Sequence, residues 1–212
     1  MLRHLSAAVI SLSLLALPLT VQAQDATMED AQAHADAIIA EAKAGEWFVN
    51  ITTAETPMVR HVPSGMTCEF VGFDDADRIH LFSRGGGEDV ACVTWIGRTL
   101  VSLYATRYTP EPTEEDVLDA AVTALLQNWP QAKELDREFE ILLLEGQEPP
   151  MMVVFDVELD EGPRRSVILV RNVGGWSFKA RATGPTDDDT AVEFGTMAFA
   201  LAMPGAYESL QD

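Results

Sequence analysis

The residues best suited by type and spacing to do chemistry lie in one polar run, Arg60-His61-Val62-Pro63-Ser64-Gly65. A serine in contact with a histidine can act as a nucleophile with its general base. This run lacks the Gly-x-Ser-x-Gly sequence that exposes a catalytic hydroxyl at a strained turn. Side chains three residues apart on an extended segment point in different directions, so we expect His61 and Ser64 to be separated. We therefore predict no catalytic residue. A hydrolase that uses His61 with an acid from elsewhere in the fold is the alternative.

Four side chains form a predicted binding set for an anionic group or a partner: Arg60, His61, Arg107 and Arg181. Arg107 and Arg181 each end an apolar segment, at equivalent places in two similar stretches of sequence. Arginine recognises carboxylate and phosphate groups through paired hydrogen bonds. In so acidic a chain, the alternative is that these arginines pair with local carboxylates, where each exposed pair contributes about 1 kcal/mol or less.

Metal ligation has little support in the sequence. The histidines after residue 23 are His34, His61 and His80, and they lack the His-x-x-x-His spacing of a zinc site. The aspartate-rich runs at 74–77 and 187–189 lack the spacing of a calcium-binding loop. The second run precedes a predicted helix, whose N-terminus favours negative charge. We expect no metal ion and no cofactor.

The elements that must position these residues are three predicted helices and a series of short strands. Residues 28–44 form an Ala-rich helical pattern with Thr27 as N-cap, and a second helix follows Thr113 and ends before Pro130. A third helix is expected over 190–203. Strands are expected at 58–61, 78–82, 90–95, 99–104, 139–144, 151–159, 165–172 and 175–182.

Strand runs interrupted by single helices predict an α+β fold that is mainly antiparallel sheet, in two meander-plus-helix halves with about three flanking helices. No long Pro- or Ser-rich linker divides residues 24–212, so we expect one domain. A weak sequence repeat relates residues 28–130 to residues 131–212, which would indicate a duplicated unit. The alternative is that the two halves are alike only because both have the ordinary succession of strand, turn and helix.

Residues 1–23 have the pattern of a signal peptide. Arg3 and His4 precede an apolar run at 7–17, and a small residue, Ala23, stands before Gln24. The apolar run is shorter than a membrane-spanning helix requires. We therefore expect cleavage near Ala23-Gln24, a periplasmic or secreted protein, and no stable membrane insertion after cleavage.

Charge and cysteine content agree with an exported protein. The chain has 14 Lys and Arg against 34 Asp and Glu, a net charge of −20, which disfavours binding to nucleic acid. Cys68 and Cys92 are the only cysteines. In an oxidising compartment such a pair is expected to form a structural disulfide, which contributes about 3 kcal/mol in chain-entropy terms.

Residues 60–68, Cys92, and the segments 104–108 and 174–183 together carry a resemblance. They are similar to uncharacterised exported proteins of Gram-negative bacteria, over most of the chain after residue 23. The resemblance implies a periplasmic address and no particular activity or functional residue. In architecture alone, the expected helix-flanked sheet also resembles PsbP/Mog1-like folds.

These observations predict a non-enzymatic periplasmic accessory or binding protein that acts through a surface or a pocket. Its expected partner is an envelope protein. The alternatives are the hydrolase that uses His61 and a small-ligand carrier with its pocket between sheet and helix.

Overall fold

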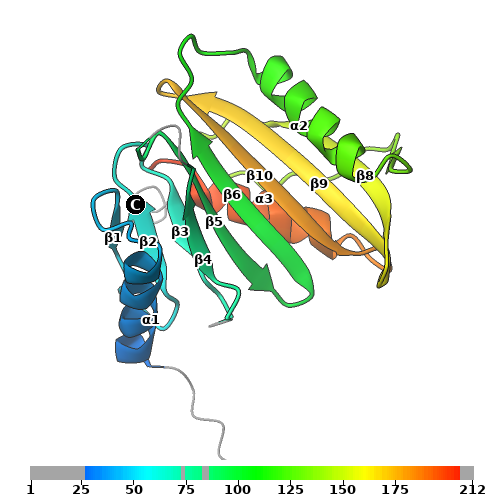
Figure 1. The fold of residues 1–212 in the computed structure, drawn as a ribbon. Helices are drawn as coiled ribbons and strands as arrows, with labels where there is room; N and C mark the ends of the chain where they lie inside the picture. The colour runs from blue at the N-terminus through cyan, green and yellow to red at the C-terminus, as the bar shows by residue number, and fades with distance from the viewer. Residues whose placement is uncertain (1–26, 73–74, 83–85, 206–212) are drawn as a thin grey trace, which may run out of the picture.

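The computed structural model describes residues 27–72, 75–82 and 86–205 (Figure 1). The predicted signal peptide, its cleavage point and Asp74 lie outside these residues. Within them the chain forms three helices and two antiparallel sheets, so the predicted α+β class is confirmed.

The smaller sheet has the order β1-β2-β3, formed by Phe48–Asn50, Met58–His61 and Thr67–Glu69. Helix α1, Met28–Glu41, lies beside it (Figure 1). The predicted cap is confirmed, because the Thr27 hydroxyl accepts a hydrogen bond from the backbone N–H of Asp30, and the Asp30 carboxylate accepts one from the N–H of Thr27.

The larger sheet has seven strands in the order β4-β5-β6-β10-β9-β8-β7. Two meanders, β4-β5-β6 and β8-β9-β10, meet where β6 pairs with β10. The strands are β4 Arg78–Leu81, β5 Asp89–Ile96, β6 Thr99–Thr106, β7 Lys133–Glu134, β8 Met151–Leu159, β9 Gly162–Val173 and β10 Trp176–Pro185. The turn between β9 and β10 is tight because Gly174 and Gly175 both adopt positive φ angles.

The two helices that follow the meanders cover opposite faces of the large sheet. Strand β9 shows this by alternation: Val167 and Leu169 belong to the core that includes α3, Thr190–Ala202. Ile168 belongs to a second core that includes α2, Glu114–Asn128. In Figure 1, α2 lies over the β9 and β8 side of the sheet, and α3 crosses the sheet on its other face.

Helix α3 lies unusually close to the strands beneath it. A Cβ atom added to Gly195 would lie 2.7 Å from Cγ1 of Val167 and 2.9 Å from Cβ of Ala182. Both distances are too short for real carbon atoms, so the absence of a side chain at Gly195 sets the spacing between helix and sheet.

The disulfide between Cys68 and Cys92 is formed, as predicted. Cys68 is in β3 and Cys92 is in β5, so the bond joins the small sheet to the large one. Both residues belong to the larger core cluster. The disulfide therefore fixes the small sheet against the core as well as closing a loop in the chain.

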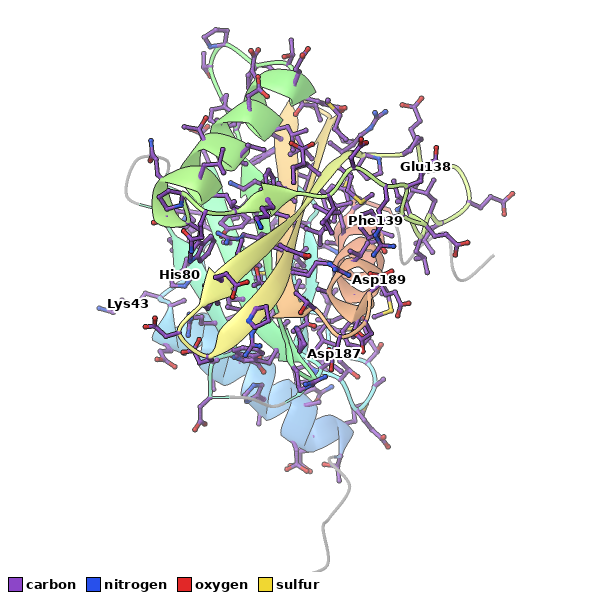
Figure 2. All side chains as sticks on the ribbon, turned by 90° about the vertical axis from the view of Figure 1, so that its right-hand side faces the viewer. Lys43, His80, Glu138, Phe139, Asp187 and Asp189 are labelled. Atoms are coloured by element: carbon purple, nitrogen blue, oxygen red, sulfur yellow. A yellow bond between two sulfur atoms is a disulfide. The ribbon has the colours of Figure 1, made fainter. Side chains whose placement is uncertain are left out.

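The predicted strand at 139–144 is wrong. Residues 136–150, here called the strap, form neither helix nor strand. The backbone leaves the sheet after Leu135, whose N–H donates to the carbonyl of Val154 in β8. The strap instead lies along α3, and Figure 2 shows Glu138 and Phe139 near Asp189 at the start of that helix.

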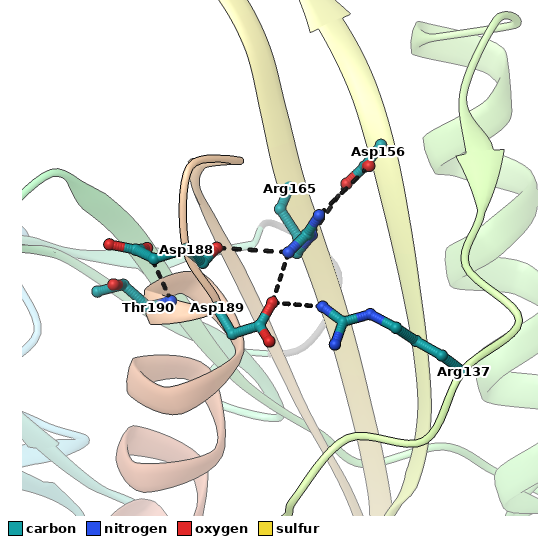
Figure 3. Close-up of polar contacts among 6 residues, drawn as sticks. All are labelled: Arg137, Asp156, Arg165, Asp188, Asp189 and Thr190. Carbon is teal, nitrogen blue, oxygen red and sulfur yellow. Dashed lines mark hydrogen bonds and ion pairs between the residues drawn. The ribbon is translucent and has the colours of Figure 1, made fainter.

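The aspartates before α3 do more than place negative charge at a helix N-terminus. The Asp189 carboxylate accepts hydrogen bonds from Arg137 in the strap and from Arg165 in β9 (Figure 3). Arg165 also donates from Nε to Asp156 in β8, at 2.9 Å. Sequence spacing could not show this, because the arginines come from distant parts of the chain. The cluster ties the strap, the sheet edge and α3 together.

Candidate binding site

A cavity of about 320 Å³ lies between the strap, the end of β9 and the C-terminal half of α3. Most of the side chains that line it are apolar. They include Ile141, Leu142, Leu143, Leu169, Phe199 and Met203. Its size and its lining are typical of a small-molecule site, since such pockets measure roughly 300–1,000 Å³ and are mainly apolar.

The strap places two leucines where they remain accessible to solvent. Leu142 is 46% exposed and Leu143 is 41% exposed, although both line the cavity. Neighbouring exposed apolar side chains that face a hollow are a sign of a binding site. Gln147 holds this part of the strap, because its Nε2 donates to the Ala200 carbonyl of α3 at 2.8 Å.

One arginine contributes charge to the cavity lining. Arg171, near the end of β9, makes ion pairs with Glu114 at the start of α2 and with Glu148 in the strap. The Glu148 side chain is 74% exposed, whereas that of Glu114 is 22% exposed. Glu114 also accepts a hydrogen bond from the backbone N–H of Asn172, at 2.8 Å. The cavity lining therefore combines apolar side chains with the charged Arg171, which pairs with one half-buried carboxylate and one exposed carboxylate.

The structure brings His61 and Ser64 together, so the expectation that they are separated was wrong. The Ser64 Oγ lies 2.8 Å from His61 Nδ1, because residues 62–65 form a tight turn closed by the hydrogen bond from Gly65 N–H to the His61 carbonyl. His61 is 0% exposed and Ser64 is 8% exposed. A general base must reach the reacting group. This pair is covered, and it holds the turn together.

His61 is packed among aromatic rings. Its ring centroid lies 4.9 Å from that of Phe48 and 5.4 Å from that of Trp176. Burial lowers the pKa of His61 from 6.5 to about 4, and a backbone hydrogen bond to Gly87 opposes this effect. The imidazole is therefore neutral at physiological pH.

The four predicted binding residues come from different parts of the fold: Arg60 and His61 are in β2, whereas Arg181 is in β10. The guanidinium of Arg107 lies 5.8 Å from the Trp176 ring, so Arg107 and His61 contact the same tryptophan. Arg60 belongs to the small sheet, where it pairs with Thr67. Arg181 does not end its strand as predicted: it lies within β10, which continues to Pro185.

Sequence reasoning missed the cavity because the strap resembled a strand. Gly146 and the neighbouring Pro149-Pro150 are the signals that favour a loop there. Nothing in the sequence near Arg171 distinguishes it from the other arginines at strand ends. Its pairing with Glu114 and Glu148 depends on long-range folding.

The parts of the chain that the structure describes contain no group of three or more His, Cys, Asp or Glu side chains arranged to hold a metal ion. In the same ranges, no helix is both long and apolar enough to cross a membrane.

The sequence matches no protein-family model and no curated protein. Among solved structures, the chain is similar to LpqN of Mycobacterium tuberculosis, a protein involved in cell envelope biogenesis. The identity is 16% and the TM-score is 0.32, over 62% of this chain and 76% of that one. A likeness at this level is too weak to support an argument about function.

Proposed function

We propose that this protein is an exported, non-enzymatic binding protein that holds a small amphiphile in the cavity beneath the strap. The ligand has an apolar body and an anionic head group. The observation that carries the proposal is a cavity of about 320 Å³ that most of its lining residues make apolar, with the charged Arg171 among them.

The apolar body of the ligand would replace water against the leucines of the strap and against Phe199. Burial of each methylene group is worth about 0.8 kcal/mol, or about fourfold in the dissociation constant. The affinity for a series of alkyl carboxylates should therefore rise with chain length until the cavity is full. A fixed cavity predicts a plateau, whereas nonspecific adsorption predicts a continuing rise.

The head group would take the place of Glu148 beside Arg171. An exposed ion pair contributes about 1 kcal/mol or less, so the Arg171–Glu148 contact is weak enough to exchange. Glu114 is the better-covered of the two partners and would keep Arg171 in position. A carboxylate ligand should bind better than an alcohol of the same length, because only the carboxylate offers two acceptor oxygens with charge.

Isothermal titration calorimetry with hexanoate, octanoate, decanoate and decanol tests the proposal. Decanoate should bind more tightly than hexanoate and decanol. Leu143→Asp should abolish binding by placing a charge in the cavity lining. Leu126→Asp is the matched control, because Leu126 is a similarly exposed leucine on α2, 37% accessible, and it does not line the cavity. Equal binding by the two variants, or no binding by the unaltered protein, would overturn the proposal.

Glu148→Gln gives a second test of the head group. Without the competing carboxylate, Arg171 should bind decanoate several-fold more tightly, while the affinity for decanol should stay the same. If Glu148→Gln does not change the ratio of the affinities for decanoate and decanol, the head group does not bind at Arg171, and that part of the proposal is wrong.

The exported location is supported by the disulfide, since such bonds persist in oxidising compartments. The intact mass of the protein purified from its host tests it. The mass should correspond to a chain that begins at Gln24 and lacks two hydrogens. A chain that retains residues 1–23 would contradict it. The expected envelope partner also remains a prediction, and cross-linking in cells would test it.

A further inference from the structure

The second core and α2 cover only part of one face of the large sheet. On β10, Phe178, Ala180 and Ala182 point into the core beneath α3. Lys179 and Arg181 alternate with them, so they point to the opposite face, beside each other. Helix α2 packs on β8 and β9. On that side, Ala91 and Val93 of β5 are buried, but Trp95 is 36% exposed, and Phe82, which follows β4, is 40% exposed.

Each of the two cations rests on an aromatic ring. The Lys179 ammonium lies 4.4 Å from the centroid of Tyr104 on β6, and the Arg181 guanidinium lies 4.3 Å from that of Trp129 after α2. Arg181 Nε also donates to the Ser166 hydroxyl, at 3.2 Å. Ring contacts of this kind attract a cation but leave its charge without a counter-ion.

Neither cation forms a salt bridge within residues 27–72, 75–82 and 86–205. The Nη2 atom of Arg181 is buried and has no hydrogen-bond partner there. Asp89 is the carboxylate whose charge reaches Lys179, and it accepts a hydrogen bond from Thr106 instead. In a chain with 34 acidic residues, two adjacent cations that form no salt bridge within the described ranges are unusual.

Burial lowers the pKa of both groups, and the charge of Arg181 lowers that of Lys179 further. The folded protein therefore holds two positive charges together at a free-energy cost. A bound anion would remove this cost, because it would neutralise both groups and accept their hydrogen bonds.

We propose that Lys179 and Arg181 form a binding site for a phosphate group on this face of the large sheet. The arginine would supply a guanidinium donor and the lysine a point charge, which together suit a doubly charged oxyanion. Ser102 pairs with Arg181 across the sheet, so its hydroxyl can add a neutral donor. The site is separate from the cavity beneath the strap. Its residues come from β6 and β10, and those of the cavity from the strap, β9 and α3.

The phosphate can be free or part of a small organic molecule. The rings of His80, Phe82 and Tyr104 form a stacked row that leads to Lys179, with centroid distances of 6.1 Å and 6.5 Å. An organic group attached to the phosphate would lie along this row. Phenyl phosphate should then bind more tightly than inorganic phosphate, and equal affinities would indicate free phosphate as the ligand.

Calorimetric titration with inorganic phosphate at constant ionic strength tests the site. The unaltered protein should bind phosphate saturably, and Lys179→Met and Arg181→Met should each weaken binding at least tenfold. Lys133→Met, which removes an exposed lysine from β7, is the matched control and should bind as the unaltered protein does. No saturable binding, or binding that survives both substitutions, would overturn the proposal.

Melting temperatures measured without phosphate show whether Lys179 serves a ligand or stabilises the fold. If Lys179 is kept for a bound anion, Lys179→Met should melt at the same temperature as the unaltered protein or higher. If Lys179 instead stabilises the fold, the variant should melt lower and phosphate should bind no differently, which would contradict the proposal. Decanoate binding should be unchanged in Lys179→Met, so failure of one proposed site leaves the test of the other intact.

Discussion

Acidification from pH 6.5 to pH 4 should destabilise this protein through one buried side chain, His61. Its pKa is about 4 in the folded protein and 6.5 when the chain is unfolded. Between these values the unfolded state binds a proton that the folded state does not, so the free energy of unfolding rises with pH across this window. The stabilisation is fully present above pH 6.5 and is lost as the pH falls toward 4.

The expected magnitude follows from the difference of about 2.5 in pKa. Each pKa unit corresponds to 1.36 kcal/mol, so His61 should account for a loss of about 3 kcal/mol between pH 6.5 and pH 4. This is a large fraction of the stability of a typical domain. The physical cause is the burial of the imidazole between Phe48 and Trp176, where water cannot solvate a positive charge.

Urea denaturation at half-unit pH steps from 4 to 8 measures this contribution when the protein is compared with His61→Asn. The asparagine keeps a polar group near Ser64 and does not titrate. The variant will be less stable at neutral pH. Between pH 6.5 and pH 4, its free energy of unfolding should fall by about 3 kcal/mol less than that of the unaltered protein. Ser64→Ala is the control: it removes a hydrogen bond but leaves His61 buried, so its pH dependence should match that of the unaltered protein. Parallel curves for the unaltered protein and His61→Asn would refute the reasoning.

Four further predictions concern the fold. Replacement of both Cys68 and Cys92 by Ala should lower the free energy of unfolding by about 3 kcal/mol in urea, because the bond closes a loop of 24 residues. Gly195→Ala should destabilise by about 1–3 kcal/mol despite the higher helix propensity of alanine, since the added Cβ has no room beneath α3; a higher melting temperature would contradict this. Thr113→Ala should cost about 1 kcal/mol by removing the α2 cap, and Thr113→Ser should cost little. Arg137→Gln should speed amide hydrogen exchange in the strap and leave α2 unchanged.

Local signals in the sequence were sufficient for most of the elements. The helix that begins after Thr113 was expected from its cap and apolar stripe, and the structure has it at Glu114–Asn128. Strands were expected at 90–95 and 99–104, and β5 and β6 pair there as a hairpin through Gly97. These features depend on residues within a few positions of one another, so the sequence contains the necessary information.

The candidate sites depend on contacts that no local pattern contains. Ile141, Leu142 and Leu143 have the apolar character of a strand, but none of them pairs with β8, and they line the cavity beside α3 instead. Arg181 resembled the end of a strand, and its position inside β10 became clear only from its pairing with Ser102.

The sequence by itself determined the class of fold, the caps, the turns and the disulfide between Cys68 and Cys92. It did so because caps, turns and apolar periodicity are properties of short segments, and because two cysteines allow one intramolecular pairing. Tertiary structure alone decided that Ser64 lies against His61, that Arg171 lines the cavity beneath the strap, and that Lys179 and Arg181 share a face of the sheet without forming a salt bridge among the described residues. Each of these arrangements results from the packing of segments that are distant in the sequence. That packing decides how deeply each charge is buried, and therefore what it costs, and it decides the shape of the cavity.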